Sequence, residues 1–262
     1  MPQRFAVWQA LLWTVSATAG LSLALTLVVA ALGRRADIVP LGLTQIGVYG
    51  AMLLAFAGWH KQPLSAIIPM RGVSLRYCLL CAALGVVLQF PSTLLANAIE
   101  HFYPLPEEVL KHRLALITPR SLAHGAAIVL IVSFLGPCIE EFFFRGALFG
   151  ALRRGHSALV TLSVVSLCFV AAHLDLRLLL PLLPAAWLMA EVRERSQSIW
   201  PGLVLHAGFN SLTLLGVFCG LTPSGKPPPM PPALALLGCL TALSLFRLCS
   251  ALMCGRNLEA HA

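Results

Sequence analysis

The sequence predicts an all-α, polytopic membrane protein with about eight transmembrane helices around an intramembrane polar cavity. Three observations lead to this fold class. Hydrophobic residues make up 58% of the chain and charged residues only 11%, whereas ordinary soluble domains are about a quarter charged. The apolar residues fall into runs of roughly the length that crosses a bilayer as a helix. A few ionisable side chains lie within or beside these runs, and they need polar surroundings away from lipid.

The apolar runs set the expected organisation. A helix needs about 20 apolar residues to span the hydrocarbon core. Runs that meet or approach this length cover residues 8–32, 38–59, 73–99, 122–144, 157–173, 176–192, 199–219 and 233–253, the fifth and sixth being short. We therefore expect one membrane-embedded domain over residues 1–262. It would comprise peripheral spans and an amphipathic segment (1–121), core spans (122–220), and a Pro-rich loop with the last span (221–262).

Two polar connections support this division. In segment 100–121, "PEEVLKHRLALI" has acidic residues first, basic residues next, and apolar residues three and four apart. This pattern predicts a short amphipathic helix at the membrane surface. The stretch "TPSGKPPPMPP" (222–232) predicts a loop, because proline fixes φ and removes backbone donors.

The net charge of +8 does not require a nucleic-acid partner. The basic residues lie mostly between the apolar runs, where they set topology and meet anionic headgroups. Eleven of the eighteen fall on the side of the two termini, so the positive-inside rule predicts cytoplasmic N- and C-termini. Arginine outnumbers lysine fifteen to three, a bias that favours a bacterial source and hence the cytoplasmic (inner) membrane.

The stretch "GPCIEEFFFRGALFG" (136–150) places three ionisable residues in an apolar run. Glu140 and Glu141 project about 100° apart on a helix, so they cannot have the same role. Glu141 and Arg145 are four residues apart with the acid first, which is the favoured order for an ion pair within one helix. Glu140 is left without a cationic partner in its own helix.

Two further polar groups lie in later runs. His173 follows Phe169 by four residues, and His206 and Asn210 are also four apart, with Gly208 between them allowing another helix to approach. Each group alone has an ordinary explanation, since a single histidine or asparagine in an apolar helix is usually a hydrogen-bonded packing residue. Together with Glu140 they lie on three separate helices, which predicts one shared hydrated cavity.

These residues carry a family resemblance. EExxxR at Glu140–Arg145, FxxxH at Phe169–His173 and HxxxN at His206–Asn210 occur in this order over about residues 130–215. The set resembles the CAAX-protease and bacteriocin-processing family of intramembrane endopeptidases, to which the eukaryotic prenyl-protein endoprotease belongs. A bacterial, myxosortase-like branch is one expectation from this resemblance. The first three spans and the last are similar to the family only in being hydrophobic.

The resemblance implies an intramembrane endopeptidase that hydrolyses a peptide bond of a membrane-associated protein or peptide, at a CAAX-type site or a C-terminal sorting tail. The core spans (122–220) would then be catalytic. Glu140 would activate water, His173 would assist, and His206 with Asn210 would stabilise the oxyanion. Supporting positions would be taken by Glu141, Arg145 and Phe169. The partners would be this substrate and the lipid bilayer, with no nucleic acid.

Several alternatives remain. Glu140, His173 and His206 could in principle bind zinc with an open fourth position. However, HExxH is absent and the family is described as glutamate-dependent, so we expect no cofactor and no metal. Ser166 and Ser211 lie near the motifs, but neither is part of GxSxG. A non-catalytic bacteriocin-immunity or scaffold protein would be expected to lack some motif residues, and none is missing. A small-solute transporter would be expected to show an internal repeat, which is not evident.

Overall fold

The computed structural model describes residues 5–33, 37–221, 226 and 228–259. In this part of the chain the secondary structure is helical throughout, with no strand. The first five helices are α1 (Val7–Leu32), α2 (Ile38–His60), α3 (Leu64–Ile67), α4 (Leu75–Phe102) and α5 (Glu107–Ile117). A continuous helix over residues 122–153 follows, and we call it the composite helix. It consists of α6 (Leu122–Val129), η2 (Leu130–Leu135), α7 (Gly136–Glu141), η3 (Phe142–Leu148) and α8 (Phe149–Arg153). The last four helices are α9 (Ala158–Ala171), α10 (Leu176–Ser196), α11 (Trp200–Phe218) and α12 (Pro232–Glu259).

The helices confirm the predicted fold class of a polytopic membrane protein. Among the described residues, six helices are long and apolar enough to cross a bilayer: α1, α2, α4, the composite helix, α11 and the part of α12 up to Leu252. The other two predicted runs are also helical. However, α9 has only 14 residues, and α10 ends in a charged segment that includes Glu191, Arg193 and Glu194. The expectation of about eight spans is therefore compatible with the structure.

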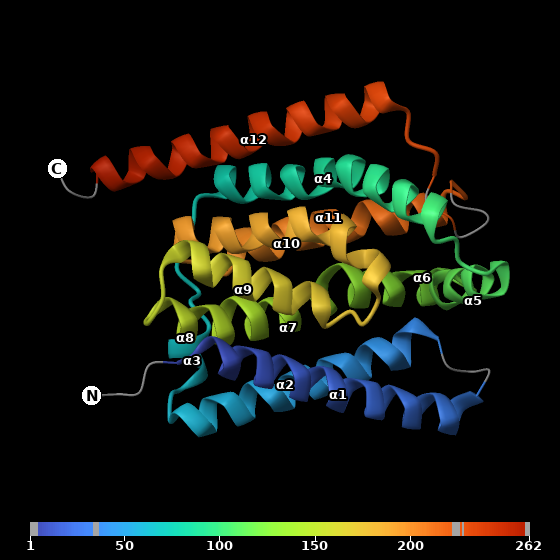
Figure 1. Cartoon of the computed structure of the whole chain (residues 1–262), viewed down its shortest axis with the longest axis horizontal. Helices are drawn as coiled ribbons and strands as arrows, with labels where there is room; N and C mark the ends of the chain where they lie inside the picture. Colours follow the sequence, from blue (N-terminus) through green and yellow to red (C-terminus); the bar gives the residue numbers. More distant parts are fainter. Residues whose placement is uncertain (1–4, 34–36, 222–225, 227, 260–262) are drawn as a thin grey trace.

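The composite helix lies at the centre of the helices that supply the polar motifs. It packs against α2, α9 and α11, and Figure 1 shows it between the α1–α2 pair and the layer formed by α10 and α11. Farther out, α4 packs against α10 and α11, and α12 packs against α4. Because three neighbouring helices meet the composite helix, side chains far apart in sequence can gather around its middle turns.

The composite helix is longer than predicted. The apolar run was expected to end at residue 144, before Arg145, but the helix continues to Arg153. A prediction based on hydropathy ends a membrane span where a charged residue such as arginine occurs. Here the Arg145 side chain is fully buried and paired with Glu141, four residues earlier. Since the charge is satisfied inside the protein, it does not force the helix to end.

Two π-helical segments, η2 and η3, flank the turn that carries the glutamates. In η2 the hydrogen bonds skip an extra residue, so that the Gly136 N–H donates to the Ile131 carbonyl. Pro137 follows, and it has no N–H to offer the Val132 carbonyl in the same register. The side chain of Asn210 fills this position, with Nδ2 donating to the Val132 oxygen at 2.9 Å. Asn210 therefore ties α11 to the composite helix about two turns before Glu140.

Small residues bring α4 and α11 into backbone contact. A Cβ atom at Gly208 would collide with the Ala82 carbonyl oxygen, and one at Gly85 would collide with the Leu205 carbonyl oxygen. The prediction that Gly208 permits a close helix approach is therefore confirmed. The contact fixes the position of α11, which carries the HxxxN motif, against α4.

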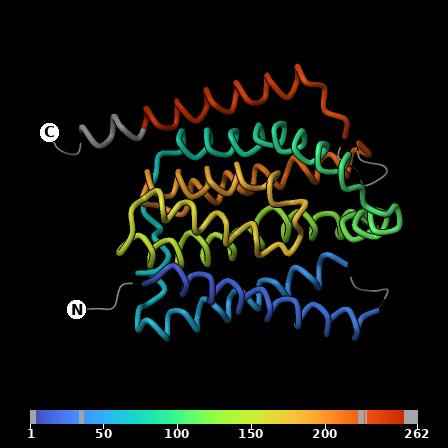
Figure 2. Tube along the Cα trace, in the orientation of Figure 1, coloured from blue at the N-terminus to red at the C-terminus, as the bar shows by residue number. Residues whose placement is uncertain are grey.

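The α9–α10 connection is a tight turn that lies part-way along the bundle rather than at its end, as Figures 1 and 2 show. Leu174 adopts a positive φ of 52° in this turn. Asp175 caps α10 by accepting from the Arg177 N–H at 3.0 Å, and it also forms an ion pair with Arg113 of α5 at 2.9 Å. The predicted surface helix in segment 100–121 is thus present as α5 and contacts this turn.

The predicted Pro-rich loop 222–232 lies partly outside the described residues. Of its positions, 226 and 228–231 are described and precede α12, which begins at Pro232.

Candidate active site

A fully buried ion pair stands at the centre of the candidate site. Arg145 Nη1 lies 2.9 Å from Glu141 Oε1, and neither side chain has exposed surface. Arg145 also donates from Nη2 to the Ala186 carbonyl of α10 at 2.9 Å, and its guanidinium lies 4.3 Å from the centroid of the Phe169 ring. The predicted pairing of Glu141 with Arg145 is confirmed. These contacts join the composite helix to α9 and α10.

The His206 side chain of α11 lies between the two glutamates. Its Nδ1 is 3.2 Å from Glu141 Oε1 and its Nε2 is 3.7 Å from Glu140 Oε2. A carboxylate only accepts hydrogen bonds, so Nδ1 carries the proton in its contact with Glu141. This contact fixes the orientation of the ring and turns Nε2 toward Glu140. Glu140 and Glu141 point in different directions from the helix, and the imidazole of His206 contacts both of them.

Glu141 has a third neighbour, Gly202 in the first turn of α11. A Cβ atom at Gly202 would lie 3.1 Å from Glu141 Oε2, so only glycine leaves ordinary space for this carboxylate. The beginning of a helix carries partial positive charge and favours an anion. Glu141 thus pairs with Arg145, contacts His206 and lies beside the first turn of α11, although its Oε2 accepts no hydrogen bond from the described residues.

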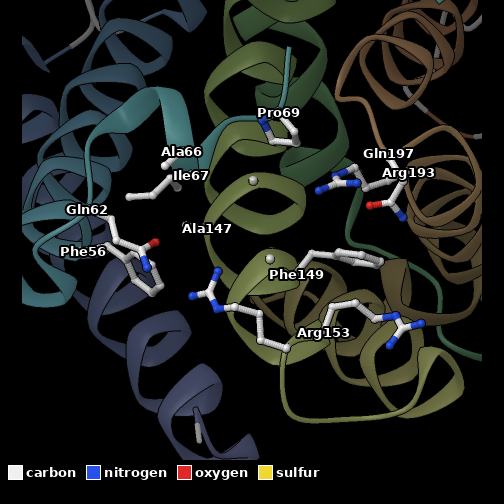
Figure 3. A pocket seen from close by; sticks show the side chains of 13 residues that line it. Phe56, Gln62, Ala66, Ile67, Pro69, Ala147, Phe149, Arg153, Arg193 and Gln197 are labelled. Carbon is white, nitrogen blue, oxygen red and sulfur yellow. The ribbon is translucent and has the colours of Figure 1, made fainter. Parts of the chain in front are cut away.

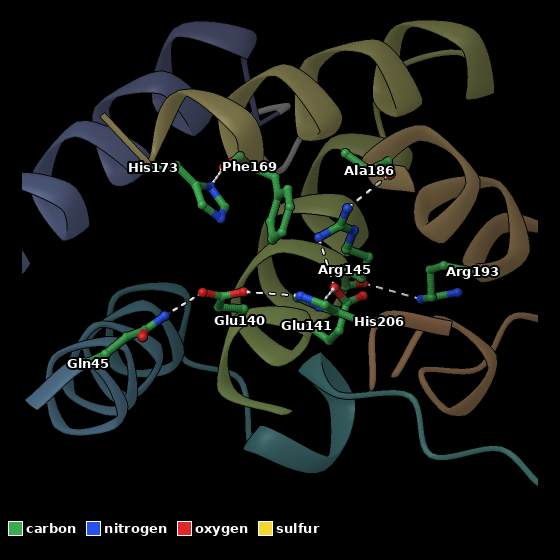
Figure 4. Close-up of polar contacts among 9 residues, drawn as sticks. All are labelled: Gln45, Glu140, Glu141, Arg145, Phe169, His173, Ala186, Arg193 and His206. Atoms are coloured by element: carbon green, nitrogen blue, oxygen red, sulfur yellow. Dashed lines mark hydrogen bonds and ion pairs between the residues drawn. The ribbon is translucent and has the colours of Figure 1, made fainter. Parts of the chain in front are cut away.

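Glu140 is the more accessible of the two acids. Its side chain keeps 13% of its surface exposed, compared with none for Glu141. Figure 4 shows Gln45 of α2 reaching one carboxylate oxygen of Glu140, while His206 faces the other. Glu140 is thus held from two sides by side chains of two other helices.

His173 follows the last residue of α9, and Figure 4 shows it above Glu140 in that view. Its Nδ1 is 2.9 Å from the Phe169 carbonyl oxygen, and its ring packs edge-on against the Phe169 ring at 5.0 Å. A carbonyl oxygen only accepts, so Nδ1 donates and Nε2 is left with a free lone pair. The side chain of His173 is exposed, unlike that of His206.

Some of the predicted site residues contact one another in the structure, and others do not. It joins Glu140, Glu141, Arg145 and His206 in one connected cluster, with the Phe169 ring packed against Arg145 and His206. In the described part of the chain, the side-chain hydrogen bonds of His173 and Asn210 go instead to backbone carbonyls. For Asn210 the physical reason is the carbonyl that Pro137 leaves without a partner. The catalytic roles expected for these residues stay predictions.

No set of three or more His, Cys, Asp or Glu side chains within residues 5–33, 37–221, 226 and 228–259 is arranged to hold a metal ion. Glu140 and His206 lie close together, and the Nδ1 of His173 bonds to the Phe169 carbonyl. The expectation of no cofactor and the zinc alternative both stay untested.

The fold and this cluster define a class: a helical integral membrane protein that keeps ionisable side chains inside its bundle, where they mark functional sites. Residues 122–212 match the family model described as type II CAAX prenyl endopeptidase Rce1-like. The match covers about a third of the chain and confirms, over these residues, the predicted resemblance to the CAAX-protease and bacteriocin-processing family. This is a family of proteases acting on protein substrates in membranes, so the match supports peptidase activity in general. Searches among curated proteins and among solved structures gave no match.

Gln45 was missed by sequence reasoning. It lies in the second predicted span, 95 positions before Glu140 and outside the matched segment. The available signal was its polarity, since an amide in an apolar run needs a hydrogen-bond partner. That signal could have marked Gln45 as an inward-facing residue, but it could not have named its partner.

Proposed function

We propose that this protein is an intramembrane glutamic endopeptidase, in which Glu140 activates the water that attacks a peptide bond of a membrane-associated substrate. The observation that carries the proposal is the position of the Glu140 carboxylate. It lies inside the bundle, yet it is partly exposed and is contacted from opposite sides by Gln45 and His206. The family match over residues 122–212 supports the reaction class.

In the proposed reaction, a Glu140 oxygen accepts a proton from water while the water oxygen attacks the scissile carbonyl carbon. The bond from this carbon to nitrogen then breaks, and the proton passes to the leaving amine, giving a carboxylic acid and an amine. His173 would position the water or relay this proton through Nε2, because Nδ1 is engaged with the Phe169 carbonyl. No covalent intermediate on the protein is required.

His206 and Asn210 would stabilise the negative oxygen of the tetrahedral intermediate. One N–H of the Asn210 amide is already donated to the Val132 carbonyl, so its second N–H is the donor available to substrate. His206 can donate from Nε2 when it is protonated on both nitrogens. A donor of this kind commonly contributes about 10²–10³ in rate.

The charge balance of the cluster suits this chemistry. Glu140 and Glu141 face a single buried guanidinium, that of Arg145, so the cluster has one excess negative charge unless a proton is added. A second proton on His206 would complete the balance. We infer that Glu141 and Arg145 act as positioning residues, and that the proton taken from water stays on Glu140 until it passes to the leaving amine.

The proposed substrate class is a membrane-anchored protein or peptide cleaved at a CAAX-type site or a C-terminal sorting tail. We propose that the protein resides in a bacterial cytoplasmic membrane, with the ends of α2, α8 and α10 on the cytoplasmic side. This orientation is supported by the basic residues Lys61, Arg71, Arg153, Arg154 and Arg195 at that end. In a bacterium, which generally lacks protein prenylation, sorting tails and peptide precursors are the favoured substrates.

The test is a cleavage assay with purified protein in proteoliposomes. The substrates would be peptides with a hydrophobic C-terminal tail and prenylated CAAX peptides, with products identified by mass spectrometry. We expect cleavage that continues unchanged after exhaustive chelation, because the mechanism uses no metal. Loss of cleavage on chelation, with recovery on adding zinc, would contradict the glutamic mechanism while preserving the peptidase assignment.

Replacement of Gln45 by leucine should lower kcat about tenfold with little change in KM. The amide orients the Glu140 carboxylate, and a hydrogen bond to a charged group contributes about 1.5–3 kcal/mol. Gln45→His should restore part of the lost kcat, because an imidazole N–H can donate in place of the amide. Thr44→Val, one position earlier on α2, is the matched control, since Thr44 bonds only to the Pro40 carbonyl of its own helix. Equal kcat for Gln45→Leu and the unaltered protein would remove Gln45 from the site.

A further inference from the structure

A second polar site lies away from the glutamates, at the end of the bundle where α3 and α8 are located. A cavity of about 230 Å³ opens there between α2, α3, α8 and α10. Its lining includes three arginines, Arg153, Arg154 and Arg193, and none of the candidate catalytic residues. Figure 3 shows Arg153 and Arg193 around the cavity together with the Phe149 ring. We call this cavity the arginine pocket.

Arg193 is built into the protein as a buried cation without a counter-ion. Its side chain is only 7% exposed. Nε donates to the Arg145 carbonyl at 3.2 Å and the guanidinium lies 5.2 Å from the Phe149 ring centroid, but Nη1 has no hydrogen-bond partner. A buried charge is costly unless it is paired and hydrogen-bonded. Although its Nη1 atom is buried, Arg193 lines the cavity, and an unpaired cation at a cavity wall points to an anionic ligand.

The other charged groups around the arginine pocket do not supply a counter-ion for Arg193. Arg153 is neutralised by Glu194, to which its Nε donates at 2.9 and 3.0 Å. Arg154 is exposed, and in the described part of the chain no carboxylate lies within ion-pair distance of it or of Arg193. The described lining residues include no aspartate or glutamate. Two unpaired guanidiniums therefore face a cavity without an acidic side chain.

The size of the cavity and the uncharged part of its lining limit the class of ligand. The cavity is smaller than the roughly 300–1,000 Å³ that hold drug-sized ligands, so it suits a small headgroup. Gln62 and Gln197 add amides to the lining, and Gly146 and Gly150 keep one wall free of side chains. Guanidinium groups match phosphate oxygens in geometry and charge. Basic pockets between helices near the membrane surface are typical sites for acidic lipid headgroups.

We propose that the arginine pocket binds a phosphate group, presented either by an acidic phospholipid headgroup or by a soluble phosphate. Arg193 and Arg154 contact the phosphate oxygens, and the apolar rim formed by Phe56, Ala66 and Ile67 lies beside the ligand. Through its bond to the Arg145 carbonyl, Arg193 connects this site with the helix that carries the glutamates. The proposal does not depend on the peptidase mechanism.

The test is binding of phosphatidylglycerol to the full chain in neutral detergent, with phosphatidylcholine as the reference lipid. Native mass spectrometry counts the retained lipids, and the shift of the thermal unfolding midpoint gives the affinity. We expect retention of phosphatidylglycerol but not phosphatidylcholine, and affinity about tenfold weaker in Arg154→Gln, since a charge-assisted contact is lost. Arg76→Gln is the matched control, because Arg76 is exposed at the same end but does not line the cavity.

A second variant tests the cavity without removing a charge. A Cβ atom at Gly150 meets no other atom within 4 Å, so Gly150→Leu should fill the cavity and abolish binding while the chain stays folded. Competition with inorganic phosphate separates the two sources. Displacement of the lipid supports a soluble phosphate, and retention supports the lipid headgroup. Equal binding by Arg154→Gln, Gly150→Leu and the unaltered chain, or equal binding of the two lipids, would overturn the proposal.

Discussion

Glu140→Gln should lower the rate of peptide cleavage by about 10²–10⁴-fold, the range that general acid–base catalysis commonly supplies. The amide keeps the size of the side chain, but it cannot take a proton from water. Contacts with Gln45 and His206 can persist in part, because the amide still has one oxygen and gains a donor. The loss should therefore appear in kcat. The measurement is single-turnover cleavage in proteoliposomes, with the thermal unfolding midpoint recorded for each variant.

Glu108→Gln is the matched control for Glu140. Glu108 is an exposed residue in the first turn of α5, and the same change of charge there should leave cleavage unaltered. His173→Ala should also lose rate while remaining folded, since His173 is exposed and its side chain bonds only to its own helix. Normal turnover by folded Glu140→Gln protein would remove Glu140 from the mechanism.

Arg145→Met should destabilise the protein by about 3–5 kcal/mol, the usual cost of leaving one member of a buried ion pair without its partner. Glu141 would keep its full burial and its contact with His206 but lose its strongest counter-charge. The Ala186 carbonyl would lose its donor as well. The measurement is reversible unfolding in mixed micelles, followed by tryptophan fluorescence.

The partly exposed ion pair of Arg153 with Glu194 provides the comparison. Arg153 is 42% exposed, and the median contribution of such a pair is about 0–1 kcal/mol, so Arg153→Met should change stability only slightly. The double variant Glu141→Gln/Arg145→Met should be less destabilised than the sum of the two single variants, because the charges that remain unpaired are removed together. Equal losses in Arg145→Met and Arg153→Met would show that the buried pair has no special energetic role.

Much of the fold follows from hydropathy and helix geometry. Every predicted run is helical, and the spacing of Glu141 and Arg145 gave the correct ion pair, because both properties depend on residues close in sequence. The predicted end of the composite helix was wrong, because it depends on residues far away in the sequence. Whether an arginine ends a span depends on the groups that surround it, and the Phe169 ring and the Ala186 carbonyl come from other helices.

For the candidate site, the sequence indicated which polar residues to consider but not which of them touch. The motifs named residues that the structure brings into contact, but no spacing indicates that His206 lies between both glutamates or that Gln45 reaches Glu140. These contacts depend on which helices are neighbours. The bond from Asn210 to Val132 depends in addition on the π-helical register before Pro137. A periodicity of 3.6 residues cannot indicate that register.

The shortness of α9 has a consequence for the surrounding lipid. Its 14 residues extend about 21 Å as a helix, whereas the hydrocarbon core is about 30 Å thick. The following turn exposes Leu174 and Leu176 by 70% and 87%, beside the ion pair of Asp175 with Arg113. A bilayer next to a short segment becomes thinner. We expect the bilayer beside His173 to be thinner than around the longer helices, which would shorten the path of water to the glutamates.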